Sequence, residues 1–148
     1  MTYAHFGRSG LLVSQIGLGT MNFGYTVDES SSFAVMDAAI DAGVNFFDTA
    51  DVYGGPQSPE MKKGYGIAEE TVGRWLQRSG HRDDIVLATK VYQPDGTWSE
   101  RPQAVRVPHS SACEASLRRL QTDHIDLYQM HHLDRATPWE EIWQAMEQ

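Results

Sequence analysis

The sequence predicts an α/β fold in which the strands of a parallel sheet alternate with helices along the chain. Short apolar runs alternate four times with longer segments of helical period. That order is typical of parallel sheets whose strands are joined by right-handed helical crossovers. A length of 148 residues is enough for one ordinary domain, and 41% hydrophobic and 22% charged residues are usual for a globular protein. We therefore expect one α/β domain.

The first half of the chain is expected to form a hairpin, a strand, a helix and a second strand. These elements span residues 3–14, 16–19, 29–42 and 44–48. Asp28 is a suitable N-cap for the helix, because its carboxylate can accept hydrogen bonds from the first helical N–H groups. Phe33, Met36 and Ile40 form one apolar stripe, and Gly43 is suited to the left-handed conformation that ends many helices.

The second half continues the alternation with three helices and two strands. We expect helices over residues 68–78, 111–120 and from 139 onward, and strands over 85–89 and 125–130. In the first of these helices, Glu69 and Glu70 lie at the start and Arg78 at the end, an order that suits the helix dipole. Thr137 is the expected cap of the last helix, with Pro138 at its first position.

Two architectures fit this order of elements: an open doubly wound sheet and a (β/α)8 TIM barrel. A dinucleotide-binding open sheet would carry Gly-x-Gly-x-x-Gly after its first strand. Residues 17–24 are rich in glycine but have a different spacing. The barrel is therefore the preferred prediction, truncated to about the first four βα units after an N-terminal β-hairpin.

The net charge, the cysteine count and the length of the apolar runs limit which binding partners and which cell compartment the protein can have. Twelve Lys and Arg against 20 Asp and Glu give a formal charge of −8, which argues against nucleic acid or an anionic membrane as the main partner. Cys113 is the only cysteine, so an internal disulfide is excluded and a reducing compartment fits. With no long apolar run for a signal peptide or a membrane span, we expect a soluble cytoplasmic protein.

Polar side chains follow the predicted strands, where the carboxyl ends of parallel strands meet and active sites are built. They are Asp48, Tyr53, Lys90 and His131. A phenol is a poor acid at neutral pH, but a neighbouring ammonium stabilises the phenolate, and a carboxylate holds the ammonium in place. An imidazole can bind the same substrate oxygen. Such a set can protonate a carbonyl oxygen while a cofactor supplies hydride.

Each of these residues has an ordinary alternative when it is taken singly. Asp48 could cap a turn, Tyr53 could pack beside two glycines, Lys90 could be a solvated strand end and His131 could be structural. A metal site is disfavoured, because Lys is not a usual ligand and no established ligand motif is present. The functional interpretation therefore depends on the four residues occurring together.

Several motifs together resemble the aldo-keto reductase family. They are Gly7–Ser14, Gly17–Met21, Gly43–Gly54, Glu69–Arg74, Ala88–Val91 and Asp126–His131. These motifs span almost the whole chain. Within the family, the residues of these motifs most resemble the bacterial branch that is related to the potassium-channel β subunits.

The resemblance implies a (β/α)8 barrel that uses NADPH to reduce an aldehyde or ketone to an alcohol. It implies Tyr53 as the general acid, Lys90 as the partner that favours its phenolate, Asp48 as the partner of Lys90, and His131 as the imidazole that orients the substrate. It also implies that Gly19, Thr20, Met21 and Asp48 bind the nicotinamide end of NADPH/NADP+. The expected partner is a small carbonyl compound, and the oligomeric state stays open. The weaker candidates for lining the substrate pocket, each of which could equally be an ordinary packing residue, are Met21, Phe23, Tyr25 and Trp98.

Two features depart from the family pattern. A complete barrel of this kind needs eight strands, so residues 1–148 are expected to be an incomplete NADP-dependent oxidoreductase domain that is inactive or binds cofactor weakly. A nucleotide-sensing or regulatory module and a non-functional truncated product are the alternatives. The stretch from Asp95 to about Ala112 is polar and irregular, which fits either a compensated frameshift or a divergent substrate loop.

Overall fold

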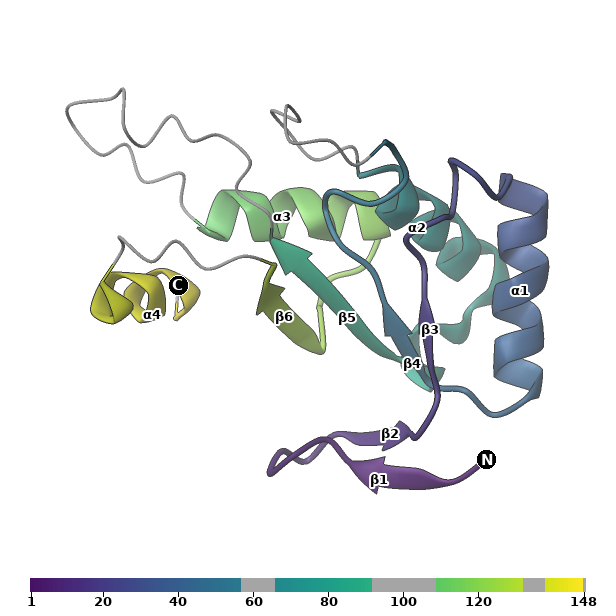
Figure 1. Ribbon diagram of the computed structural model, residues 1–148, viewed down its shortest axis with the longest axis horizontal. Coiled ribbons are helices and arrows are strands. Elements are labelled where there is room, and N and C mark those ends of the chain that lie inside the picture. The colour runs from purple at the N-terminus through teal and green to yellow at the C-terminus, as the bar shows by residue number, and fades with distance from the viewer. Residues whose placement is uncertain (57–65, 92–108, 132–137, 148) are drawn as a thin grey trace.

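The computed structural model describes residues 1–56, 66–91, 109–131 and 138–147 and confirms the α/β prediction (Figure 1). The strands are β1 (Tyr3–His5), β2 (Leu12–Ser14), β3 (Gly17–Gly19), β4 (Phe46–Asp48), β5 (Val86–Val91) and β6 (Leu127–Met130). The helices are α1 (Glu29–Asp41), α2 (Ile67–Ser79), α3 (His109–Leu120) and α4 (Trp139–Met146), with a short 3₁₀ turn, η1, over His81–Asp84. Strands β3 to β6 pair in parallel in that order, while β1 and β2 form an antiparallel hairpin.

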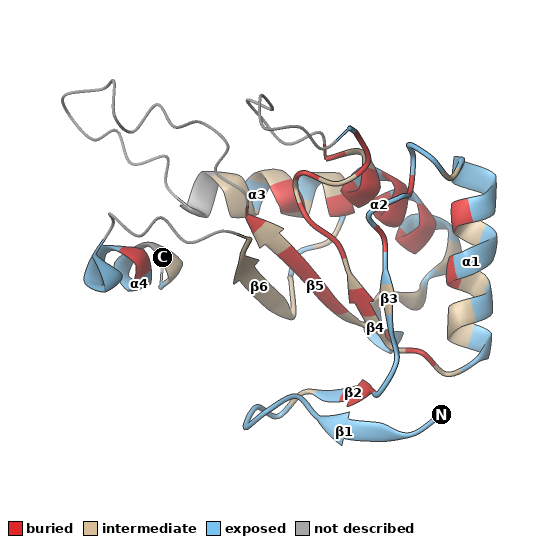
Figure 2. Cartoon of the chain, in the orientation of Figure 1, coloured by how far each residue is buried: buried red, intermediate tan, exposed pale blue. Residues whose placement is uncertain are grey.

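The hydrophobic core lies between one face of the parallel sheet and helices α1, α2 and α3 (Figure 2). Leu18, Phe47 and Leu87 are neighbours across β3, β4 and β5, so their side chains share a face. Phe47 and Leu87 are fully buried there against helix residues that include Met36 and Trp75. Because side chains alternate along a strand, Asp48, Ala88 and Lys90 belong to the opposite face, which in a barrel is the interior.

Helix ends agree with most of the capping predictions. The Asp28 side chain accepts a hydrogen bond from the Ser31 N–H at 2.8 Å, and Gly43 follows α1 with a left-handed φ of 80°. The expectation for the last helix was wrong by one residue. Helix α4 begins at Trp139, so Pro138 occupies the N-cap position, where it makes no side-chain capping bond. Thr137 lies outside the described residues.

The hairpin is fixed to the amino-terminal end of the sheet, away from the predicted site. The Asn45 side chain, just before β4, accepts a hydrogen bond from the Ser14 N–H at 2.7 Å and donates one to the Leu12 carbonyl at 3.0 Å. The Phe6 ring also lies 5.7 Å from the Phe46 ring, centroid to centroid. The hairpin therefore covers the start of β4.

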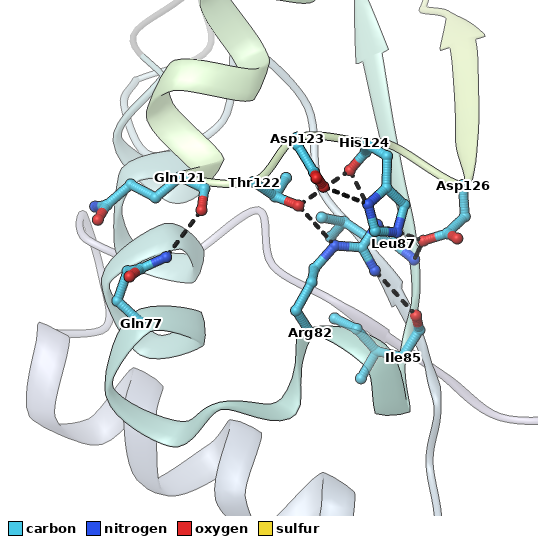
Figure 3. Close-up of polar contacts among 9 residues, drawn as sticks. All are labelled: Gln77, Arg82, Ile85, Leu87, Gln121, Thr122, Asp123, His124 and Asp126. Carbon is cyan, nitrogen blue, oxygen red and sulfur yellow. Dashed lines mark hydrogen bonds and ion pairs between the residues drawn. The ribbon is translucent and has the colours of Figure 1, made fainter.

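A polar cluster fixes the starts of β5 and β6 (Figure 3). Arg82 donates to Thr122 Oγ1 at 3.0 Å, to the Ile85 carbonyl at 3.3 Å, to the His124 carbonyl at 2.9 Å and to Asp126 Oδ2 at 2.8 Å. The same Asp126 oxygen accepts the backbone N–H of Leu87 at 2.8 Å. We call Arg82, Thr122, His124 and Asp126 the Arg82 cluster. It joins the loops before both strands at the end of the sheet that lies opposite the predicted site.

None of the helices in the described parts of the chain is long and apolar enough to cross a membrane.

Candidate active site

Three of the four predicted site residues are in direct contact at the carboxyl ends of β4 and β5. The Lys90 ammonium nitrogen lies 2.7 Å from Asp48 Oδ2, 3.0 Å from the Thr49 carbonyl oxygen and 3.1 Å from the Tyr53 hydroxyl. An ammonium has three N–H donors and no acceptor, so these three oxygens account for all of its hydrogen bonds. The phenolic oxygen of Tyr53 is therefore an acceptor from Lys90, and no residue that the structure describes accepts a hydrogen bond from its own O–H.

His131 stands beside the same tyrosine. Its backbone N–H donates to the Val91 carbonyl at 2.9 Å, which places it directly after the paired part of β6. Its ring meets the Tyr53 ring edge to face, with centroids 5.5 Å apart and planes at 88°. The structure thus brings the predicted imidazole into contact with the phenol through their rings.

The loop after β4 places Tyr53 within reach of Lys90. The Asp51 N–H donates to the Lys90 carbonyl at 3.1 Å, and the Tyr53 carbonyl accepts the Ala68 N–H from the first turn of α2 at 3.2 Å. Gly54 has a φ of 93°, and a Cβ at this position would lie 2.6 Å from the Ala68 nitrogen. Only glycine therefore allows the loop to pass so close to the helix.

The ion pair at the centre of the site is largely shielded from water. The Lys90 side chain is 15% exposed and that of Asp48 is 30% exposed. Partial burial strengthens the attraction between the two charges and limits screening by salt. The carboxylate thus holds the ammonium in place next to the phenol.

Gln129 is a neighbour of the site that sequence reasoning missed. It is paired with Lys90 across β5 and β6, and its Nε2 lies 3.5 Å from Asp48 Oδ1. The alternation of side chains along β6 offered a signal, because position 129 lies two residues before His131 and thus on the same face.

The segment predicted to hold the nicotinamide end of a cofactor runs along the edge of the same site. Gly19 is paired with Asp48 in the sheet, and a Cβ at Gly19 would meet no atom of the described residues within 4 Å. Thr20 is fully buried, and its N–H and hydroxyl both donate to the Asp48 carbonyl, at 3.0 and 3.1 Å. Met21 follows with half of its surface exposed. Open space over a bare backbone beside Asp48 fits the flat ring of a nicotinamide.

The weaker candidates for lining the substrate pocket differ in how far they are exposed. Met21 and Tyr25 are exposed, as a pocket-lining role requires, at 50% and 56%. Phe23, for which ordinary packing was the alternative, is 4% exposed and belongs to the hydrophobic core. Trp98, and the irregular stretch as far as residue 108, lie outside the described residues.

Comparison with known proteins agrees with the resemblance seen in the motifs. Residues 15–148 match the Aldo/keto reductase family profile. An uncharacterized oxidoreductase of Bacillus subtilis, YrpG, is 48% identical over 99% of this chain and 45% of its own length. A probable voltage-gated potassium channel subunit beta of Oryza sativa is 36% identical over 99% of this chain and 42% of its own length. An aryl-alcohol dehydrogenase [NADP(+)] of Phanerodontia chrysosporium is 34% identical over 93% of this chain and 37% of its own length.

A solved structure is similar over the same extent. The holo form of an aldo-keto reductase from Bacillus halodurans, AKR11C1, superposes with a TM-score of 0.75 at 36% identity, covering 99% of this chain and 45% of that one. The chain therefore spans a little under half the length of the relatives it matches, and it corresponds to the N-terminal portion of their barrel, with the hairpin and the first parallel strands. By its sequence profile and its fold, the chain belongs to the aldo/keto reductase family.

Proposed function

We propose that this chain carries the proton-donating half of a site that reduces an aldehyde or ketone to an alcohol with NADPH. The observation that carries the proposal is the contact at 3.1 Å between the Lys90 ammonium and the Tyr53 hydroxyl, together with the contact at 2.7 Å between the same ammonium and Asp48. Membership of an oxidoreductase family supports the reaction class.

The arrangement supplies a proton in the following way. Tyr53 accepts one hydrogen bond from Lys90, so its own O–H can point at a carbonyl oxygen. As that proton leaves, the phenolate that develops is stabilised by an ammonium already in hydrogen-bonding position, without further reorganisation. We propose that Asp48 keeps the ammonium oriented and that His131, whose ring lies at right angles to the Tyr53 ring, binds the same carbonyl oxygen.

The cofactor, when bound, would supply hydride to the carbonyl carbon. We propose that Gly19, Thr20, Met21 and Asp48 hold its nicotinamide end, because the backbone is open at Gly19 and Gly19 is paired with Asp48. The preference for NADP over NAD is proposed from the relative whose name carries NADP(+). The substrate is proposed to be a small carbonyl compound, and the setting the cytoplasm.

A chimera tests the proposal, since the chain matches the first part of a longer relative. Residues 1–148 would replace the matching portion of the Bacillus subtilis relative, and loss of NADPH absorbance would be followed with an aromatic aldehyde such as 4-nitrobenzaldehyde. Tyr53→Phe should lower turnover by roughly 100-fold or more while leaving NADPH affinity unchanged, because only the proton donor is removed. Full turnover by Tyr53→Phe would refute the assignment of the general acid.

The similarity to a potassium channel subunit beta favours a second candidate, a module that senses nucleotide without sustained turnover. Saturable NADPH binding by the chimera in the absence of aldehyde reduction would support that function over catalysis. The 148-residue chain alone is expected to be inactive or to bind NADPH weakly. Micromolar binding by this chain, measured by calorimetry, would overturn that expectation.

A further inference from the structure

A buried carboxylate lies directly behind the proposed site, on the opposite face of β5. Glu69, in the first turn of α2, is completely buried. Its Oε1 accepts the Thr89 hydroxyl at 2.6 Å and its Oε2 lies 2.6 Å from the Arg119 Nε. We call Glu69, Thr89 and Arg119 the Glu69 clamp; it joins α2 to β5 and to α3.

The clamp is a costly way to fill an interior. Removing a carboxylate and most of a guanidinium from water is unfavourable, whereas burying an apolar side chain is favourable; the Arg119 side chain is 25% exposed and that of Glu69 is fully buried. Apolar replacements of similar volume are often no less stable. The site is also built tightly around the pair. A Cβ on Gly66 would collide with the Arg119 side chain, and one on Gly73 would collide with the Arg119 backbone. Such an arrangement calls for a reason other than stability.

The first turn of α2 carries the loop that presents Tyr53. The Ala68 N–H donates to the Tyr53 carbonyl at 3.2 Å, and the Gly66 N–H donates to the Asp51 carbonyl at 2.8 Å. Glu69 is the next residue of the same turn. Because of these two hydrogen bonds, a shift of this turn along the sheet would also move the backbone at Asp51 and at Tyr53.

The other arm of the clamp reaches the lysine. Thr89 immediately precedes Lys90 on β5, and the two side chains point to opposite faces of the sheet. When Glu69 holds the Thr89 hydroxyl on the helix side, it fixes the segment of strand from which Lys90 projects towards Asp48 and Tyr53. One carboxylate thus lies in the helix turn that is bonded to the Tyr53 backbone and contacts the residue that precedes Lys90.

We propose that Glu69 is a positioning residue that sets the distance between the Tyr53 hydroxyl and the Lys90 ammonium. The catalytic meaning of this distance rests on the function proposed above, but the distance itself is a property of the folded chain. Glu69 touches neither group, and it acts through the α2 turn on one side and through Thr89 on the other.

The test measures how far the Tyr53 NMR signal moves when the Lys90 ammonium is removed. The 148-residue chain is isotope-labelled at the Cζ carbon of tyrosine, and the Tyr53 NMR signal is identified by its loss in Tyr53→Phe. In the wild type, Lys90→Met should displace this signal, because the phenolic oxygen loses its donor. When Lys90→Met is made in the Glu69→Gln variant, we expect it to displace the Tyr53 signal by less than half as much as in the wild type, because Tyr53 and Lys90 are already separated there. Thr89→Val, which removes one arm and keeps the ion pair with Arg119, should reduce it in the same direction by less.

Two controls separate positioning from general loosening. Glu70→Gln changes the neighbouring exposed glutamate of the same helix turn and should leave the full displacement. Asp126→Ala lowers stability at the other end of the strands, in the Arg82 cluster, and should also leave it. The proposal is overturned if Thr89→Val and Glu69→Gln both retain the full displacement, or if Asp126→Ala reduces it as much as they do. Should Glu69→Gln not fold, Thr89→Val decides alone.

This outcome is independent of turnover. If the chimera reduces no aldehyde while the displacement behaves as expected, the proposed function fails and the positioning role stands. If the chimera turns over and the displacement survives in both clamp variants, the positioning role fails and the function stands.

Discussion

Replacing Asp126 by alanine should destabilise the chain substantially, although the residue lies far from the proposed site. The substitution removes one carboxylate oxygen that serves two donors, the Arg82 guanidinium and the Leu87 backbone N–H, each at 2.8 Å (Figure 3). Leu87 is fully buried, so its N–H loses its acceptor in a place where water does not easily replace it.

The size of the effect follows from these two losses. A buried backbone N–H without an acceptor costs about 1–3 kcal/mol, and a hydrogen bond to a charged group contributes about 1.5–3 kcal/mol. The second figure is reduced here, because Arg82 and Asp126 are 15% and 21% exposed and Arg82 keeps three other oxygen acceptors. We expect a loss of about 2–4 kcal/mol in the free energy of unfolding, and a fall in Tm of roughly 3 °C for each kcal/mol at this chain length.

Urea unfolding followed by circular dichroism measures the loss, with Asp123→Ala as the matched control. Asp123 lies in the same loop but is 94% exposed, and its partner is the exposed His124 ring, so its replacement should leave the midpoint unchanged. A double-mutant cycle with Arg82→Ala should give a coupling of about 1–2 kcal/mol between the two residues. Equal midpoints for Asp126→Ala and Asp123→Ala, with no coupling to Arg82, would show that the cluster does not fix the strand starts.

Three further predictions concern single positions. Gly73→Ala should cost about 1–3 kcal/mol in urea unfolding, since the new methyl group meets the Arg119 backbone, whereas Gly10→Ala, with open space around it, should cost little. The Ser31 backbone N–H lowers the pKa of Asp28 below its usual value of about 4, so the stability advantage over Asp28→Ala should be complete at neutral pH. It should shrink as the pH falls below about 4; an advantage that is constant down to pH 2 would contradict this cause. Burial, followed by the charges of two glutamates, raises the pKa of Cys113. Its alkylation by iodoacetamide should therefore be slower than that of free cysteine, and the alkylation rate should keep rising to a more alkaline pH. A pH–rate profile like that of free cysteine would count against this cause.

Much of the secondary structure was predictable because its signals are local. Asp28 and Gly43 mark the two ends of α1 through capping chemistry that depends only on neighbouring backbone groups. The alternation of strands and helices likewise predicted parallel pairing. Pro138 shows the limit of such signals, because a proline suits both the N-cap and the first helical position, and the one-residue difference was assigned wrongly.

Residues whose role depends on distant partners were harder to predict. Phe23 lies in a loop, and its burial depends on the helices that close over it, so its hydrophobicity alone fitted a pocket equally well. Glu69 looked like an ordinary acidic residue at a helix start. Its burial depends on Arg119, which lies 50 residues further along the chain. By contrast, the contact between Tyr53, Lys90 and Asp48 was predictable, because parallel strands bring their carboxyl ends together whatever the loops between them.

Strand β5 has a structural contact at its start and a contact of the proposed site at its end, only a few residues apart. At its start the Leu87 N–H is held by Asp126, and at its end Lys90 projects towards the phenol. An engineer who wished to raise the heat resistance of this chain could therefore work on the loops before β5 and β6, leaving unaltered the end of the same strand that carries Lys90.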